Sequence, residues 1–448
     1  MKVAFISLGC DKNLTDSEHM LYLLHKDNIE ISSEEDADVI VVNSCCFIAD
    51  SLEESIDNII AAGELKKKGK LSGLVLSGCM SERYKDEIRE ELPEVDTIVG
   101  TNSYDNIVEA VKAAYNHEKK EYFKPHLGIP NICGRISTTD LPYNFVKIAE
   151  GCNKFCTYCV IPSIRGRFRS VPMEMVLHEI NQLADDGITE INLVAQETTL
   201  YGIDLYGKKM LPTLLSEIEK IKYIKSIRLL YCYPETIDEE LVYEMARNKK
   251  VLHYIDMPIQ HCNDLILHRM NRKATKQLIL DKIKLLRDKI PDIAIRTTLI
   301  TGFPGETDEM HEEMKEFIKQ VKFDRLGVFT YSREKNTPAY NFPNQVDEEV
   351  KKKRKDELMR LQKTISLMKN RESVGNVVST FVEGYVPEKK IYVGRTYKDA
   401  PNVDNYIFFK SDIDLMSGSI VDCLLYTSPS PRDVRKQLVC RLLLEKKN

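Results

Sequence analysis

Three cysteines in the stretch EGCNKFCTYC, residues 150–159, have the spacing C-x3-C-x2-C. A four-iron, four-sulfur cluster is held by thiolates, and Cys152, Cys156 and Cys159 supply three of the four ligands that it needs. Structural zinc is the alternative, but such sites are closed by four protein ligands, commonly in C-x2-C pairs, and the chain has no second pair. The spacing therefore predicts a cluster with one iron open for an exchangeable ligand.

Three further cysteines each follow a predicted strand. Cys10 follows VAFISL, Cys45 follows VIVV and Cys79 follows LVLSG. Each alone would more often be a packed core residue, but the carboxyl ends of parallel strands share one edge, where ligands bind. This edge predicts a second three-cysteine cluster. Cys46 is adjacent to Cys45, and neighbours on an extended strand point to opposite faces, so only one of the two can readily be a ligand.

The elements that must position these cysteines form an α/β multidomain chain. Residues 1–123 alternate apolar strands with helices, as in a parallel sheet with crossover helices, and residues 124–142 form a linker rich in Pro, Gly, Ser and Thr. Residues 143–346 contain six βα units. Six units are too few for a closed barrel of eight, so we expect a partial (βα)6 barrel of the TIM type, with its chemistry at the carboxyl ends of the strands.

The C-terminal part has a different pattern. Residues 347–372 predict a charged connecting helix, and residues 373–422 predict a small antiparallel β-barrel. The sequence CLLYTSPSPRD, which follows, can be back-translated into the end of a transposase sequencing adapter. We therefore expect the native sequence to stop near Asp422, which truncates this barrel, and residues 423–448 to be a non-native tail that packs against nothing.

Composition limits the class of protein. With 448 residues and 43% hydrophobic content the chain can bury several cores. Its N-terminus lacks a signal-peptide pattern and no apolar run is long enough to span a membrane, so we expect a cytoplasmic protein with no membrane partner. In that reducing compartment the 12 cysteines favour metal or redox chemistry over disulfides.

The cysteine loop also carries a family resemblance. A C-x3-C-x2-C motif with an aromatic residue, Tyr158, before its last cysteine, at the head of a partial (βα)6 barrel, resembles the radical S-adenosylmethionine enzymes. The resemblance implies that S-adenosylmethionine chelates the fourth iron. It also implies that an electron from the cluster cleaves this cofactor to methionine and a 5'-deoxyadenosyl radical, which abstracts hydrogen from an unactivated carbon.

Longer motifs narrow the resemblance to the methylthiotransferases. They are SLGCDKNLTDSE, VNSCCFI, RGRFRSVP, QETTLYG, LLYCYP, MPIQH, GFPGET and FDRLGVFTYSREKNTPAY, spread over residues 2–422. They are most similar to the branch that methylthiolates the β-carbon of an aspartate in ribosomal protein twelve of the small subunit. The layout implied is an N-terminal domain with Cys10, Cys45 and Cys79 on a second 4Fe-4S cluster, a radical barrel and a C-terminal TRAM domain.

The same resemblance implies the reactants. Two S-adenosylmethionine molecules are used per turnover: one methylates sulfur held on the N-terminal cluster, and the other gives the radical. A sulfur donor and a reductant such as flavodoxin or ferredoxin are implied as partners. A tRNA N6-modified adenosine methylthiotransferase with the same core is the nearer alternative, and a non-catalytic iron-sulfur RNA-binding protein is the more distant one.

Candidate contacts for S-adenosylmethionine lie where the barrel mouth is expected. They are Tyr158, Gln196 at the end of the second strand, Arg296 at the fifth, and Gly302 and Gly305 in GFPGET, where glycines allow a flat ligand such as adenine to approach the backbone. A plain βα turn and satisfied structural polar groups are the alternatives.

Charge bears on the substrate. Residues 370–422 carry six basic and eight acidic side chains. A module that grips tRNA phosphates needs a basic face, so this balance makes tRNA an unlikely partner and favours a basic ribosomal protein. Lys389, Lys390 and Arg395 nevertheless suggest a local basic patch as the alternative.

Overall fold

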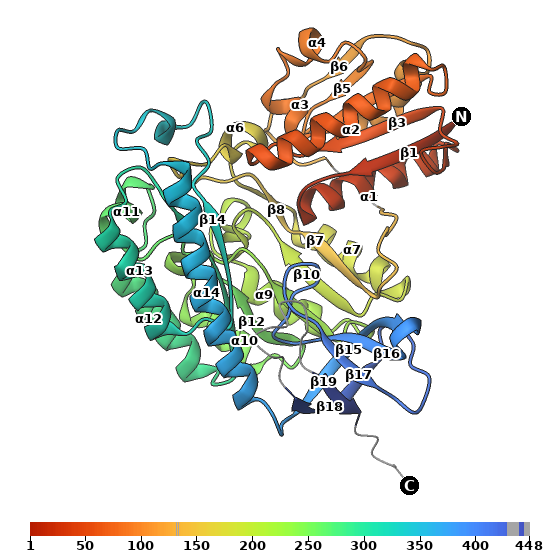
Figure 1. The fold of residues 1–448 in the computed structure, drawn as a ribbon. Coiled ribbons are helices and arrows are strands. Elements are labelled where there is room, and N and C mark those ends of the chain that lie inside the picture. Colours follow the sequence, from red (N-terminus) through yellow and green to blue (C-terminus); the bar gives the residue numbers. More distant parts are fainter. Residues whose placement is uncertain (131, 133, 428–438, 443–448) are drawn as a thin grey trace.

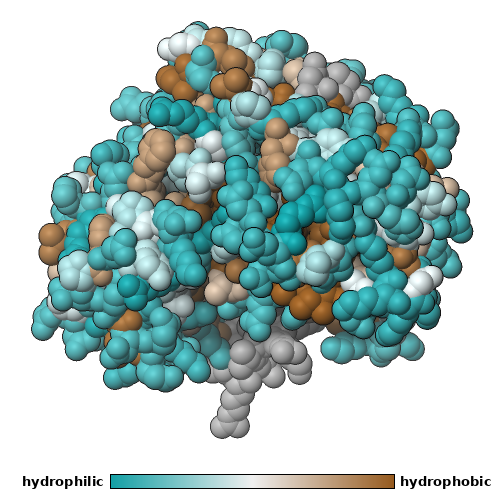
Figure 2. Space-filling view, turned by 90° about the horizontal axis from the view of Figure 1, so that it is seen from above, coloured by the Kyte–Doolittle hydropathy of each residue, from teal (hydrophilic) through white to brown (hydrophobic). Residues whose placement is uncertain are grey.

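The structure, a computed structural model, describes residues 1–130, 132, 134–427 and 439–442. Figure 1 shows three successive parts: an N-terminal α/β sheet, an open barrel of alternating strands and helices, and a small β-barrel packed against the open one. The predicted fold class is thereby confirmed. No helix in the described part of the chain is long and apolar enough to cross a membrane, and Figure 2 shows a mainly hydrophilic surface with scattered hydrophobic residues.

The N-terminal sheet is entirely parallel, with the order β2-β1-β3-β4-β5-β6. Its strands are β1 (Lys2–Ser7), β2 (Glu30–Ile31), β3 (Val39–Ser44), β4 (Gly73–Gly78), β5 (Thr97–Val99) and β6 (Lys120–Tyr122). The edge strands β2 and β6 have too few residues to show an apolar pattern, and the sequence did not predict them. The central strands β3 and β4 are buried throughout, as expected for a parallel sheet covered on both faces.

Helices cover both faces of this sheet. One face packs against α2 (Ala49–Lys67), and the other packs against α1 (Asp11–Lys26) and α5 (Ile107–Tyr115). Two short helices, α3 (Cys79–Arg83) and α4 (Ile88–Glu91), follow β4. The carboxyl edge of the sheet meets the open barrel, because Val160 and Ile164 of the barrel pack in the same cluster as Cys46 and Cys79.

The open barrel has six parallel strands in the order β14-β13-β12-β11-β10-β7. These strands are β7 (Tyr143–Lys147), β10 (Glu190–Val194), β11 (Ser226–Leu229), β12 (Val251–Asp256), β13 (Ala294–Thr301) and β14 (Arg325–Thr330). Its longer helices are α7 (Met173–Asp185), α9 (Leu211–Glu219), α10 (Glu239–Arg247), α12 (Lys276–Lys289), α13 (Asp308–Val321) and α14 (Glu348–Glu372). These helices bury their apolar faces against the strands in the largest core cluster.

Short elements form the ends of this barrel. They are β8 (Ala149–Glu150), which pairs with β9 (Arg169–Ser170), and the helices α6 (Ile161–Arg165), α8 (Ile203–Tyr206) and α11 (Asp264–Arg269). The cysteine loop therefore runs from β8 to α6.

The C-terminal domain is a closed barrel in which β15–β16, β15–β18, β16–β17 and β18–β19 are antiparallel and β17–β19 is parallel. Its strands are β15 (Val377–Val386), β16 (Ile391–Thr396), β17 (Ile407–Lys410), β18 (Ile420–Thr427) and β19 (Val439–Leu442).

The expectation that residues after Asp422 pack against nothing is wrong for the described residues. Strand β18 continues to Thr427, with Cys423 and Leu425 buried in the barrel core, and β19 closes the barrel between β17 and β18. Alternating apolar residues extend the inward face of a strand whatever their origin, since the pattern alone sets the face. The adapter origin stays a prediction, and residues 428–438 and 443–448 lie outside the described residues.

Candidate iron–sulfur sites

The three cysteines of the barrel loop lie close together at the carboxyl side of β7. Cys152 and Cys156 are each only 6% exposed, and Cys159 is half-buried. Backbone N–H groups donate to two of the sulfurs, from Lys154 to Cys152 at 3.4 Å and from Ile161 to Cys159 at 3.5 Å. Hydrogen bonds to the ligating sulfurs are one means by which proteins tune iron–sulfur clusters, so the loop is suited to hold one.

These thiols would release protons on binding iron. The pKa of the Cys152 thiol is raised to about 11, chiefly by burial and also by Glu197 and Cys156, whereas the backbone N–H of Lys154 opposes the rise. Burial also raises the pKa of Cys159, and the charges of Cys156 and Cys152 add to the effect. A bound cation reverses this balance, because a coordinating thiol is deprotonated outright.

An arginine that the sequence did not single out lies beside this loop. Arg272 is buried, and its guanidinium carbon lies 4.3 Å from the centroid of the Tyr233 ring. Burial by itself lowers the pKa of this guanidinium, but Tyr158, Tyr233 and Cys156 raise it above its usual range. One N–H group donates to the carbonyl of Pro258, but Nε and Nη1 have no partner among the described residues. Buried donors without partners are costly, so this side chain fits an anionic occupant next to the thiols.

The N-terminal cysteines come from the ends of three strands. Cys10 is the exposed N-cap of α1, Cys45 follows β3 directly, and Cys79 is the first residue of α3 after β4. The pKa of the Cys79 thiol is raised to about 12, chiefly by burial; Cys10 and Cys45 contribute to the rise, whereas Arg165 opposes it. The fold therefore brings the three side chains near one another at the carboxyl edge of the sheet.

Two glycines allow this close approach. Gly9 and Gly78 precede Cys10 and Cys79, and both have a φ of +91°. A Cβ atom on Gly9 would lie 2.7 Å from Cβ of Cys45, and one on Gly78 would lie 2.4 Å from Oδ1 of Asn43. Only glycine adopts this conformation without strain and leaves room for the neighbouring strand. The repeated Gly-Cys pairs were a signal that the sequence analysis did not use.

Cys46 is buried in the same apolar cluster as Cys79, whose charge acts on its thiol. It lies near Arg83, whose Nη1 donates to the Cys46 carbonyl at 2.8 Å, and burial raises the pKa of its thiol. The backbone of Cys45, in contrast, is fixed by Ser55, which accepts from its N–H at 3.0 Å and donates to its carbonyl at 2.7 Å.

Among the described residues, no three His, Cys, Asp or Glu side chains converge so as to hold a single metal ion. Two thiolates on one zinc ion lie within about 4.6 Å of each other, since each Zn–S bond is about 2.3 Å long. A four-iron cluster instead places its own inorganic core between the thiolates, which therefore stand farther apart.

Two candidate contacts for S-adenosylmethionine lie near the barrel loop. Tyr158 packs edge-on against Phe303, with ring centroids 6.4 Å apart. Gln196 follows β10 and is only 8% exposed; its Nε2 donates to Oε1 of Glu150 at 2.7 Å, while its Oε1 is buried without a partner among the described residues. An acceptor left free in this position fits a polar ligand that donates a hydrogen bond.

The other three candidates have protein partners. Arg296 is the third residue of β13, so its expected position at the carboxyl end of the strand is wrong, and it pairs with Asp256 at 2.8 Å and with Asp404 of the C-terminal domain at 3.4 Å. Gly302 packs against the side chain of Lys351, and Gly305 packs against that of Arg269. Sequence spacing could not place these partners, because they come from other elements.

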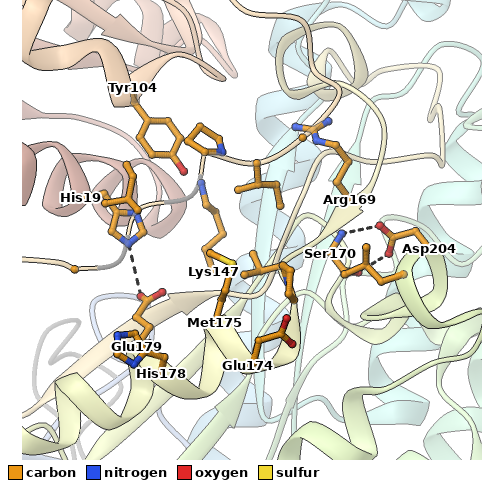
Figure 3. A pocket seen from close by; sticks show the side chains of 18 of the residues that line it. His19, Tyr104, Lys147, Arg169, Ser170, Glu174, Met175, His178, Glu179 and Asp204 are labelled. Atoms are coloured by element: carbon orange, nitrogen blue, oxygen red, sulfur yellow. Dashed lines mark hydrogen bonds and ion pairs between the residues drawn. The ribbon is translucent and has the colours of Figure 1, made fainter.

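A separate cavity of about 530 Å³ lies between α1, α7 and residues 127–130, 132 and 134. Figure 3 shows His19 facing Glu179 across it, and Ser170 bound to Asp204. Among the described residues that line this cavity there is no cysteine and no candidate S-adenosylmethionine contact. Much of its lining comes from the open barrel, namely Lys147, residues 169–172, several residues of α7, Asp204 and Leu205.

Three family models match successive parts of the chain. The model described as "Uncharacterized protein family UPF0004" matches residues 2–100, "Radical SAM superfamily" matches residues 146–318, and "TRAM domain" matches residues 374–429. The last match extends beyond Asp422, as strand β18 does.

Relatives match over nearly the whole length. The chain is 50% identical to the ribosomal protein uS12 methylthiotransferase RimO of Lachnoclostridium phytofermentans, over 94% of this chain and 96% of the relative. It is 45% identical to the protein of the same name from Clostridium tetani, over 94% of each. Among solved structures, the radical S-adenosylmethionine methyltransferase TsrM from Kitasatospora setae has a TM-score of 0.57 at 14% identity, covering 86% of this chain and 81% of that one. The last likeness shows the fold alone.

Proposed function

Because the chain belongs to the RimO family of radical S-adenosylmethionine methylthiotransferases, we propose that it adds a methylthio group to the β-carbon of an aspartate in ribosomal protein uS12. The proposal includes two 4Fe-4S clusters, one on Cys152, Cys156 and Cys159 and one on Cys10, Cys45 and Cys79. It also includes two S-adenosylmethionine molecules per turnover, a sulfur donor, and a reductant of the flavodoxin or ferredoxin type.

The observation that carries the proposal is the contact between the two domains that hold the cysteine sets. The carboxyl edge of the N-terminal sheet packs against α6, the helix that directly follows the barrel cysteines, and this contact supports a reaction that uses both sets. When bound, the barrel cluster supplies the electron that cleaves S-adenosylmethionine and so gives the radical that removes hydrogen from the substrate carbon.

The residues of the chain bind and orient the S-adenosylmethionine ligand. The buried donors of Arg272 and the free Oε1 of Gln196 provide opposite hydrogen-bonding character at the barrel mouth, suited to the carboxylate and the amino group of one ligand. Tyr158 and Phe303 form an aromatic wall beside them. The low exposure of Cys152 and Cys156 keeps water from the site, which protects a reactive radical from side reactions.

The acidic surplus of the C-terminal domain does not support the protein substrate, contrary to the expectation from sequence. Three of its acids are used internally: Asp399 pairs with Arg325, Asp404 with Arg296, and Glu383 with Arg395. Arg395 is itself buried and cannot join Lys389 and Lys390 in a basic patch. The proposed substrate therefore rests on the relatives.

Iron content tests the two-cluster part. Anaerobic reconstitution should give about eight irons per chain, since each three-cysteine set holds about four. Replacing Cys152, Cys156 and Cys159 by Ala should halve this content and abolish formation of 5'-deoxyadenosine. Replacing Cys10, Cys45 and Cys79 should halve it as well but leave cleavage of S-adenosylmethionine measurable, and full iron content in that variant would refute the N-terminal site.

Mass spectrometry tests the substrate. The reconstituted enzyme is given S-adenosylmethionine, sulfide, a reductant, and either ribosomal protein uS12 or N6-modified tRNA. We expect a gain of about 46 mass units, the formula mass of CH2S, on a peptide with an aspartate. The same gain on an adenosine nucleoside alone would favour the tRNA enzyme, and no cleavage of S-adenosylmethionine at all would favour a non-catalytic protein.

A further inference from the structure

Arg165, the last residue of α6, extends from the barrel loop into the N-terminal cysteine site. Its side chain is only 2% exposed. Nη2 donates to Sγ of Cys79 at 3.6 Å and to Oδ1 of Asn13, and Nη1 donates to Asp16 at 2.6 Å and to Glu150 at 3.1 Å. One guanidinium thus contacts α1, α3 and β8 at once.

Two carboxylates and further cations surround this guanidinium, and one of these cations is Arg169, whose Nη1 donates to the Arg165 carbonyl at 3.2 Å. Asp16 and Glu150 are the two carboxylates, and Lys147 is the second cation, bonded to both of them. Replacing Arg165 by a neutral residue would therefore remove one positive charge from a buried place next to Cys79. Electrostatic effects are strong in such surroundings because little water is present to screen them.

We propose that Arg165 is a positioning residue of the N-terminal iron–sulfur site, which donates a hydrogen bond to the Cys79 sulfur and raises the reduction potential of the cluster by its fixed positive charge. The inference rests on the proposed function, since it requires a cluster on Cys10, Cys45 and Cys79. Hydrogen bonds to the sulfurs and the net charge nearby are known determinants of cluster potential. The hydrogen bond and the positive charge both stabilise the reduced cluster, which carries one more electron.

The same contacts link this site to the barrel mouth. Glu150, which accepts from Arg165 through Oε2, accepts from Gln196 through Oε1 at 2.7 Å. A chain of hydrogen bonds therefore runs from Cys79 through Arg165 and Glu150 to Gln196. Arg165 lies six positions after Cys159 in the sequence, so a single segment supplies ligands to one site and a charge to the other.

The test measures the one-electron reduction potential of the N-terminal cluster by potentiometric titration followed by electron paramagnetic resonance. The parent protein has Cys152, Cys156 and Cys159 replaced by Ala, so that a single cluster contributes. We expect Arg165→Gln to shift the potential to more negative values and Arg165→Lys, which keeps the charge, to stay close to the parent. Glu150→Gln removes a negative charge and should shift the potential in the positive direction.

Arg135→Gln is the matched control. Arg135 is also buried and also ties α1 to the barrel, through Glu18 and Glu179, and its partners among the described residues include no cysteine. Its replacement should leave the potential unchanged. A potential unchanged in Arg165→Gln, or shifted equally in the control, overturns the proposal. If the Arg165→Gln protein cannot hold iron, the Glu150→Gln protein provides the test: a shift of the potential in the positive direction supports the proposal, and a negative shift or none overturns it. A parent protein without iron would refute the N-terminal cluster itself. The iron content of the parent therefore separates a failure of the proposed function from a failure of the role of Arg165.

Discussion

Arg395 is predicted to anchor the C-terminal barrel to the open barrel. Its side chain is only 1% exposed. The guanidinium donates hydrogen bonds to Glu190, at 3.1 and 3.3 Å, and to Glu383. Its central carbon lies 5.1 Å from the ring centroid of Tyr143 and 5.0 Å from that of Phe381. Replacing Arg395 by Met keeps much of the packing on the rings but removes the charge.

The size of the effect follows from the two acids left behind. Breaking a buried ion pair by removing one partner costs about 3–5 kcal/mol. Glu190 keeps a second partner, Arg228 at 3.2 Å, whereas burial already raises the pKa of Glu383, so that carboxyl can take up a proton once Arg395 is gone. We therefore expect a loss at the lower end of the range, about 3 kcal/mol.

Hydrogen exchange followed by mass spectrometry measures this loss in the native protein, which is useful because the chain has no tryptophan for fluorescence. Amides of β16 should exchange about 10²-fold faster in Arg395→Met, as about 3 kcal/mol corresponds to that ratio. Arg371→Met, at an exposed position, should change exchange by less than about threefold. Exchange in Arg395→Met within that same small factor would refute the anchoring role.

Three further predictions concern stability and iron content. Burial lowers the pKa of His19 to about 4, so this side chain takes up a proton near pH 6.5 in the unfolded protein but not in the folded protein. The free energy of unfolding should therefore fall by about 3 kcal/mol between pH 6.5 and pH 4. Urea titrations of the metal-free protein measure this loss, and His19→Phe should lack it. Leu425→Ala should lower the stability of the C-terminal barrel by about 2–5 kcal/mol because the side chain is buried, whereas Tyr426→Ala, at an exposed neighbour, should lower it little. Equal effects of the two variants on hydrogen exchange of β18 would contradict the placement of this strand. Cys46→Ala should keep the iron content of the wild type after reconstitution, whereas Cys45→Ala should lose about four irons; the reverse result would exchange their roles.

Local patterns in the sequence determined the elements and one of the two cysteine sites. Apolar runs of the right length predicted the central strands of both sheets, because a buried parallel strand needs apolar side chains on both faces. The cysteines at 152, 156 and 159 lie in one loop, so their spacing alone brought them together. Cys10, Cys45 and Cys79 were predicted to meet only through the general rule that parallel strands end at a common edge.

Tertiary structure decided which side chains the charged groups meet. Arg165 contacts Cys79 and Asn13, which are 86 and 152 positions away in the sequence, and no periodicity encodes such a pair. The acidic side chains of the C-terminal domain likewise pair with arginines of the open barrel, so the sequence charge of a segment did not equal its surface charge. Backbone elements follow from neighbours along the chain, whereas the partner of a buried charge is set by how the domains pack, since only there is water excluded from both groups.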